Sequence, residues 1–242
     1  MIDSRVKLYH ERARDLFQRA RMVFLSSSAA EQYRAAIRRR AFMTIEQERR
    51  WGDSQASGWG STRERTKVTQ GIIATVIKQS EVQSMLDVGC GDFVWMPLVL
   101  QQLAGGFRYV GCDMVPALIN RNAAAYPQYE FKVVDFVTDE LPSCDLIFCR
   151  DTLQHLPIAD ITTALQNFSR SGGKYLLAST HLRRFGRRNA QECRVGQCKD
   201  RNLLLKPFNL PDPIALFSEQ DPSHKFLGLW KLPFERGHRD GC

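Results

Sequence analysis

Strand-like and helix-like segments alternate through the middle of this chain, and that alternation constrains its fold more than any other feature. Short apolar runs typical of buried strands cover residues 84–89, 108–113, 129–135, 144–150 and 174–180. Helical periodicity follows several of them, at 93–104, 115–126 and 158–170. Parallel strands need crossover helices, and such helices cover both faces of the sheet. The pattern therefore predicts an α/β fold, Rossmann-like and doubly wound, with a mostly parallel sheet.

Segments on either side of this core extend the prediction. Residues 213–220 and 225–232 have strand character without a helical pattern between them, so we expect them to add a terminal antiparallel pair and complete a seven-stranded sheet. Apolar stripes at 4–25 and a basic segment at 29–50 predict an N-terminal helical extension, either an accessory layer or a lid over a substrate site. The predicted domains are the extension, residues 1–58, and the sheet domain, residues 59–242.

A glycine- and serine-rich stretch, residues 52–66, is expected to form a loop. Ser61 or Thr62 is placed to cap the helix that follows, which should end near Ser80. No apolar run approaches the roughly 20 residues needed to cross a bilayer, and the N-terminal segment is charged throughout. We therefore expect a cytoplasmic protein that does not enter a membrane.

The net charge of +8 is concentrated in the first 50 residues and at 183–201. Basic surfaces of this kind can bind nucleic acid or other anions, although a solvated basic surface is the simpler explanation. No zinc-finger spacing accompanies the charge, and the pattern predicts no metal site.

A glycine turn interrupts the first predicted strand at residues 85–96. Gly89 and Gly91 follow the acid Asp87 at the strand's carboxyl end, where glycine lets the chain turn tightly and lets a ligand approach the backbone. The turn does not follow the G-x-G-x-x-G pattern, because Val94 stands at the third glycine position, and it is not a phosphate loop. A pyrophosphate ligand is therefore disfavoured.

Polar residues also end the next three predicted strands. Because parallel strands end at one rim of the sheet, these side chains should gather around one cleft. The acid after the second strand can accept hydrogen bonds from two ribose hydroxyls, and an acid beside an aromatic ring after the third strand suits an adenine. In order along the chain, the rim residues are Asp113, Asp135, Phe136, Arg150, Asp151 and His155.

The same segments resemble the motifs of class I S-adenosylmethionine-dependent methyltransferases. "LDVGCGDF" is similar to the glycine-rich first motif, "YVGCDMV" to the segment with the ribose-binding acid, "VVDFVTDELP" to the adenine-contact segment, and "CDLIFCRDTLQHL" to the fourth-strand motif. The resemblance extends over about 60–235, and it departs from many members at Phe93, where they have a further glycine.

This resemblance implies S-adenosyl-L-methionine as the cofactor and assigns residues to its parts. Asp87, Gly89 and Gly91 would line the methionine moiety. The ribose would meet Asp113, and the adenine would meet Asp135 and Phe136. Further cofactor-binding residues implied are Met114, Arg150, Trp59 and Ser61.

The expected reaction is methyl transfer, and a hydroxyl acceptor would need a base. His155 is the first candidate and Asp151 the second, while a structural histidine near a helix start is the alternative for His155. The chain has no [DN]-P-P-[YF] segment after the fourth strand and no Pro-Cys pair. These absences favour a hydroxyl of a small molecule or saccharide. An RNA or protein methyltransferase that docks through the basic N-terminal helices, and a non-catalytic cofactor-binding or interaction protein, are the alternatives.

Overall fold

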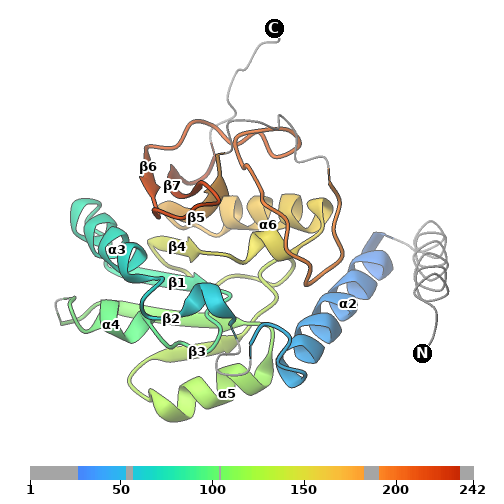
Figure 1. Cartoon of the computed structure of the whole chain (residues 1–242), viewed down its shortest axis with the longest axis horizontal. Helices are drawn as coiled ribbons and strands as arrows, with labels where there is room; N and C mark the ends of the chain where they lie inside the picture. The colour runs from blue at the N-terminus through green and yellow to red at the C-terminus, as the bar shows by residue number, and fades with distance from the viewer. Residues whose placement is uncertain (1–26, 53–56, 104, 183–190, 235–242) are drawn as a thin grey trace, which may run out of the picture. The chain divides into compact units, whose positions relative to one another are not determined.

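The computed structural model describes residues 27–52, 57–103, 105–182 and 191–234 (Figure 1). The chain forms two compact units, residues 1–38 and 39–242, and the sheet belongs to the second. The helix expected at 29–50 is present as α2, Ser27–Gln47. The helix expected at 4–25 lies outside the described residues, and the domain boundary after residue 58 stays a prediction.

A seven-stranded sheet in the order β3-β2-β1-β4-β5-β7-β6 forms the centre of the second unit (Figure 1). The first five strands in that order pair in parallel, and β7 pairs antiparallel with both β5 and β6. The predicted Rossmann-like sheet and its terminal antiparallel pair are therefore confirmed. The strands are β1 Ser84–Val88, β2 Arg108–Asp113, β3 Glu130–Val133, β4 Leu146–Cys149, β5 Tyr175–His181, β6 Ala215–Ser218 and β7 Lys225–Lys231.

Helices cover both faces of this sheet, and the alternation of side chains along β1 shows how. Met85 packs with the apolar faces of α3, Lys67–Gln79, and α4, Met96–Leu100. Leu86 and Val88 point the other way and pack with α6, Ile158–Arg170. The helix α5, Pro116–Ala125, packs against β2 and β3. Two buried faces explain why the strands are apolar runs rather than alternating patterns.

Two helix starts differ from the prediction. The helix expected from residue 93 begins at Met96, because Phe93 has a φ of 56° and its ring packs 5.2 Å from that of Tyr109. A left-handed residue cannot continue a right-handed helix, so the predicted start was wrong.

The predicted cap of α3 was also wrong. The helix begins at Lys67 after Thr66, whereas Ser61 belongs to a separate 3₁₀ turn, η1, Trp59–Ser61. A second 3₁₀ turn, η2, Leu153–His155, follows β4.

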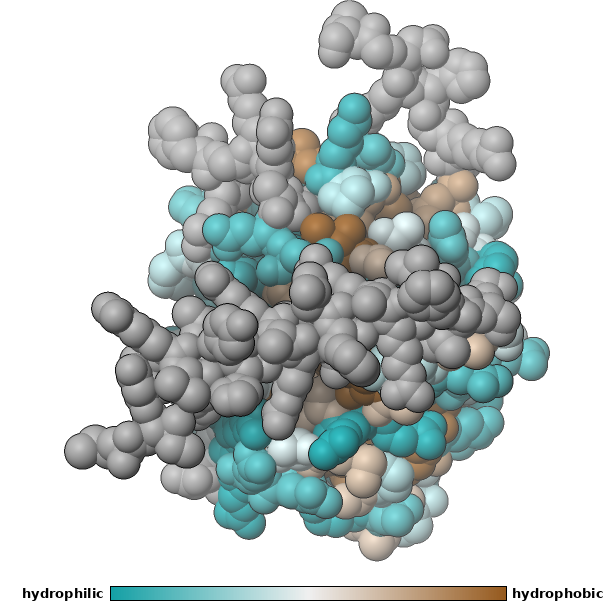
Figure 2. Space-filling view, turned by 90° about the vertical axis from the view of Figure 1, so that its right-hand side faces the viewer, coloured by the Kyte–Doolittle hydropathy of each residue, from teal (hydrophilic) through white to brown (hydrophobic). Residues whose placement is uncertain are grey.

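Where Figure 2 shows the described residues, hydrophilic side chains predominate, and hydrophobic ones are visible in smaller areas between them. Within the described ranges, every helix is too short or too polar to cross a bilayer.

Candidate functional site

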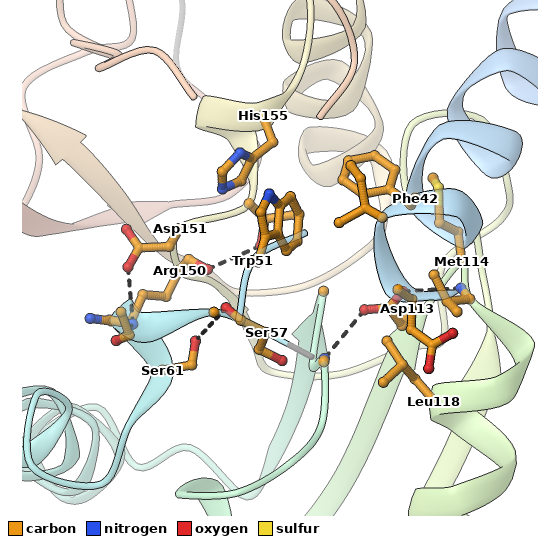
Figure 3. A pocket seen from close by; sticks show the side chains of 18 of the residues that line it. Phe42, Trp51, Ser57, Ser61, Asp113, Met114, Leu118, Arg150, Asp151 and His155 are labelled. Carbon is orange, nitrogen blue, oxygen red and sulfur yellow. Dashed lines mark hydrogen bonds and ion pairs between the residues drawn. The ribbon is translucent and has the colours of Figure 1, made fainter. Parts of the chain in front are cut away.

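A cavity of about 430 Å³ opens at the carboxyl ends of the parallel strands (Figure 3). Its wall is built from the segments that follow β1 to β4, from the end of α2, and from residues 57–61. The sheet therefore brings together residues that are far apart in the sequence. The predicted residues on the wall are Trp59, Ser61, Gly89, Gly91, Asp113, Met114, Phe136, Arg150, Asp151 and His155.

The glycine turn after β1 is closed around two neighbouring side chains. A Cβ added at Gly89, whose φ is 77°, would lie 2.6 Å from the Thr152 hydroxyl oxygen. A Cβ at Gly91, whose φ is 57°, would lie 1.9 Å from the Ser57 hydroxyl oxygen. Glycine is thus favoured at both positions by the backbone angle and by the close contact. The space left by the missing glycine side chains is therefore partly occupied by Thr152 and Ser57.

Ser57 joins the loop before η1 to the glycine turn. The backbone N–H of Asp92 donates to the Ser57 hydroxyl at 2.8 Å, and the Ser57 N–H donates to the Asp92 carboxylate at 3.3 Å. The Ser61 hydroxyl donates back to the Ser57 carbonyl at 3.3 Å. Sequence analysis did not single out Ser57; its position in a small-residue loop was the signal available. These bonds hold the loop against the cavity.

Asp113 at the end of β2 is one of the acids on the cavity wall. Its carboxylate accepts hydrogen bonds from the Gly91 N–H at 3.2 Å and the Val115 N–H at 3.0 Å. Burial raises the pKa of Asp113 to about 6, although these backbone donors oppose the rise. Each carboxylate oxygen can accept more than one hydrogen bond, so Asp113 retains capacity for a ligand hydroxyl.

Asp87 and Asp135 do not line the cavity. The Asp87 carboxylate accepts a hydrogen bond from the Tyr109 hydroxyl at 2.8 Å beneath the turn. Burial raises the pKa of Asp87 to about 7, and the charge of Asp113 adds to the rise, while the Tyr109 bond opposes it. The Asp135 carboxylate accepts from the Val137 N–H at 3.1 Å. Their assignment to a ligand stays a prediction.

A buried group of four charged side chains, the ionic cluster Arg150, Asp151, Glu219 and Lys225, lies beside the cavity at the end of β4. Arg150 contacts the Asp151 carboxylate through Nη1 at 3.0 Å and Glu219 through Nε at 2.6 Å. Lys225 Nζ lies 2.7 Å from Asp151 Oδ2 and 3.5 Å from Glu219 Oε2. Sequence analysis missed Glu219 and Lys225, although charged residues at the ends of two predicted strands were a usable signal.

The ionic cluster determines the charge state of Asp151. Burial alone would raise the pKa of Asp151, but the neighbouring Arg150 and Lys225 cations outweigh it and hold that pKa below its usual range. Asp151 is therefore ionised and shared between two cations, which makes it a weaker proton acceptor than its position suggested. Arg150 also donates to the Gly60 carbonyl at 3.2 Å and so ties η1 to the rim.

His155 lies on η2 with its ring directed toward Trp51 (Figure 3). The two ring centroids are 4.6 Å apart, and the Phe42 ring lies 5.9 Å from that of Trp51. Burial lowers the pKa of His155 to about 4, against the opposing effects of Asp151 and the Gln197 backbone, so the imidazole is neutral near pH 7. Trp51 and Phe42 were not predicted as site residues, because they precede the sheet domain.

Trp59 marks the outer part of the cavity wall. Its side chain is 69% exposed, and the Arg65 guanidinium carbon lies 2.9 Å from the centre of its ring. A cation over an indole face is favourable even at an exposed position. The ring is therefore held at the cavity edge by a neighbour from the same segment.

Comparison with known proteins agrees with this architecture. Residues 86–171 match a family model described as "Methyltransferase domain". No curated protein matches the sequence. The N-methyltransferase NodS from Bradyrhizobium japonicum WM9, solved in complex with S-adenosyl-L-homocysteine, has 15% identity and a TM-score of 0.54, covering 81% of this chain and 99% of that one.

Two further solved structures share the fold. Human N-acetylserotonin methyltransferase, in complex with SAM, has 18% identity and a TM-score of 0.53, and the match covers 70% of this chain but only 53% of the human chain. Magnesium protoporphyrin IX methyltransferase from Synechocystis PCC 6803, with bound SAM, has 12% identity and a TM-score of 0.52, covering 70% and 79% of the two chains. Residues 86–171 thus match a methyltransferase domain, and the protein has the fold of these solved methyltransferases, as its motifs predicted.

Proposed function

We propose that this protein transfers a methyl group from S-adenosylmethionine to a hydroxyl of a small molecule or a saccharide. The methyltransferase domain and the fold shared with enzymes solved in complex with SAM support the cofactor. The observation that carries the proposal is Asp113, a half-buried carboxylate fixed by two backbone N–H groups on the wall of the cavity. An acid held in this way is suited to accept two vicinal ribose hydroxyls.

The remaining wall residues fit the same cofactor. Met114, Leu118 and Phe136 provide apolar surface beside Asp113, as an adenine requires. A cation bound in the cavity would favour the ionised form of Asp113, whose pKa is raised by burial. When bound, S-adenosylmethionine supplies a methyl group already activated by a positively charged sulfur.

The chain itself then has to hold and orient the acceptor. Trp51 offers a flat apolar surface, and the neutral imidazole of His155 beside it can take a proton from a hydroxyl. A pKa of about 4 keeps His155 unprotonated at neutral pH but makes it a weak base. Alignment therefore provides most of the expected rate enhancement, for which good positioning can contribute up to about 7–11 kcal/mol.

Calorimetry with S-adenosylmethionine and S-adenosylhomocysteine tests the cofactor assignment. Asp113→Ala should weaken binding at least tenfold, because the ribose loses a charged acceptor, about 1.5–3 kcal/mol. Asp113→Asn keeps one acceptor oxygen and should bind with intermediate affinity. The control is Asp212→Ala, which removes an exposed acid that does not line the cavity.

Unchanged affinity in a folded Asp113→Ala protein would remove the ribose assignment. Methyl transfer is tested separately, by incubating the protein with methyl-labelled cofactor and fractionated metabolite extracts. Label recovered in an ether would support a hydroxyl acceptor, and label recovered only in methylated amines would contradict it.

A further inference from the structure

A buried asparagine on the helix α5 contacts the glycine turn from outside the cavity. Three residues of this helix are buried, and Asn122 is the polar one beside Leu118 and Ile119. Asn122 is only 4% exposed and does not belong to the cavity wall. Burying an amide destabilises a fold unless the amide is hydrogen-bonded, and asparagine is a poor helix former. The presence of Asn122 at this position is therefore explained by the contact that its side chain makes.

That contact is with the backbone of the glycine turn. Asn122 Nδ2 donates to the Gly91 carbonyl at 2.8 Å, across 31 positions of the chain. The N–H of the same peptide group, which belongs to Asp92, donates to the Ser57 hydroxyl at 2.8 Å. The peptide group between residues 91 and 92 is thus held on both sides, by one side chain from α5 and one from the loop before η1. Rotation of this peptide group would break both hydrogen bonds.

Gly91 connects this peptide group to the acid at the end of β2. The Gly91 N–H donates to one oxygen of the Asp113 carboxylate at 3.2 Å, and the Val115 N–H donates to the other oxygen at 3.0 Å. Asn122 therefore holds one side of the glycine whose other side holds Asp113. A glycine with a φ of 57° has few steric limits of its own, so outside contacts determine how its two peptide groups are oriented.

We propose that Asn122 is a positioning residue for the cofactor: by fixing Gly91, it orients the Asp113 carboxylate toward the two ribose hydroxyls. This inference rests on the proposed function, in which Asp113 accepts hydrogen bonds from those hydroxyls. Asn122 itself lies outside the cavity wall and does not touch the nucleoside. Its loss should therefore act through the ribose contact and leave the contacts of the adenine and methionine parts intact.

Calorimetry with S-adenosylhomocysteine and its 2′-deoxy analogue measures the ribose contact. The wild type should prefer the ribonucleoside by about tenfold, because a hydrogen bond to a charged acceptor contributes at least that factor. In Asn122→Leu, which keeps the branched shape and removes the donor, this preference should fall by about threefold or more. A residue with only a structural role would weaken the binding of both ligands equally. The matched control is Asn120→Leu, at an exposed position on the same helix.

A double-mutant cycle shows whether Asn122 acts through Asp113. Asp113→Ala removes the carboxylate, so adding Asn122→Leu to it should cause little further loss of S-adenosylhomocysteine affinity. Two independent losses that multiply in the double variant would overturn the inference, and so would an unchanged ribose preference in Asn122→Leu. If Asn122→Leu does not fold, Asn122→Ala removes the same donor with a residue that favours helices, and the same comparisons apply.

Amide hydrogen exchange of Gly91 tests the contact without any ligand. Segments that bind ligands open at a lower free energy than the whole domain, so the exchange rate of this amide reports on the turn. The rate should rise about fivefold in Asn122→Leu, since one neutral hydrogen bond contributes about that factor, and stay the same in Asn120→Leu. An unchanged rate in Asn122→Leu would show that the turn does not depend on the amide and would overturn the inference.

Failure of the proposed function gives a different result from failure of this inference. A ribose preference that survives in Asp113→Ala would contradict the ribose assignment, and the proposal for Asn122 would fall with it. A preference that is lost in Asp113→Ala but intact in Asn122→Leu would contradict the role of Asn122 alone.

Discussion

At the scale of single residues, Gly91 is a position where a substitution is strongly restricted. Its φ of 57° disfavours a side chain, and a Cβ there would lie 1.9 Å from the Ser57 hydroxyl oxygen. Gly91→Ala should destabilise the fold by about 1–3 kcal/mol and weaken S-adenosylhomocysteine binding, because the turn also donates to Asp113. Urea unfolding and calorimetry measure the two effects.

The control for Gly91→Ala is the same substitution within α3. A Cβ at Gly71 meets nothing within 4 Å, so Gly71→Ala should stabilise the protein by up to about 1 kcal/mol through helix propensity. Equal effects at the two glycines would show that the contact with Ser57 is not restrictive.

Residues of the site differ in how far the sequence could predict them. Gly91 and Asp113 were predicted to meet at the rim because the ends of parallel strands converge, and the Gly91 N–H does donate to Asp113. Trp51, Ser57 and Asn122 could not be placed in this way. The first two precede the sheet domain, and the local sequence of a loop does not indicate which part of the fold the loop will contact. Asn122 resembles any surface asparagine of a helix until its amide is found on the Gly91 carbonyl.

At the scale of elements, Arg150 joins segments that the sequence does not connect. It links the end of β4 to Glu219 beyond β6 and to Gly60 in η1, with only 5% of its side chain exposed. Arg150→Met should destabilise the protein by about 3–5 kcal/mol, because two buried carboxylates would share a single lysine. Arg108→Met, which removes a half-exposed pair with Glu130, should change stability by less than about 1 kcal/mol.

Chemical unfolding of both arginine variants measures these differences. A small effect at Arg150 would mean that Lys225 alone satisfies the ionic cluster. The stability change and the loss of cofactor binding should appear together, because Arg150 holds η1 against the rim of the cavity.

Secondary-structure elements were predicted well where the local sequence pattern determines their position, and poorly where tertiary contacts determine it. All seven strands were expected, since each is an apolar run bounded by turn residues. The start of α4 was not, because the left-handed backbone at Phe93 is stabilised by packing against aromatic rings from other parts of the chain. Single-sequence periodicity contains no information on such long-range contacts.

At the scale of the whole molecule, the fold keeps two acids, Asp87 and Asp113, in surroundings that raise their pKa values to about 7 and about 6. Between the usual aspartate pKa of 3.8 and these values, the unfolded chain is ionised while the folded chain still holds the protons. The folded state binds more protons at these two acids, so their contribution to stability falls as the pH rises from about 4 to about 7, whereas the lowered pKa of His155 acts in the opposite direction. Burial of these two acids at the strand ends therefore lowers their contribution to stability at neutral pH.

Asp87→Asn isolates the larger of these two contributions. The amide oxygen can still accept the Tyr109 hydrogen bond, but the buried group no longer ionises. The variant should gain stability over the wild type above pH 7, by at most about 4 kcal/mol, and the gain should shrink toward pH 4. Urea unfolding at several pH values measures it, with the exposed Asp212→Asn as control. A gain in stability that is the same at pH 5 and pH 8 would contradict this account. Such a gain would come from altered packing around residue 87, because an effect of the Asp87 charge must depend on pH.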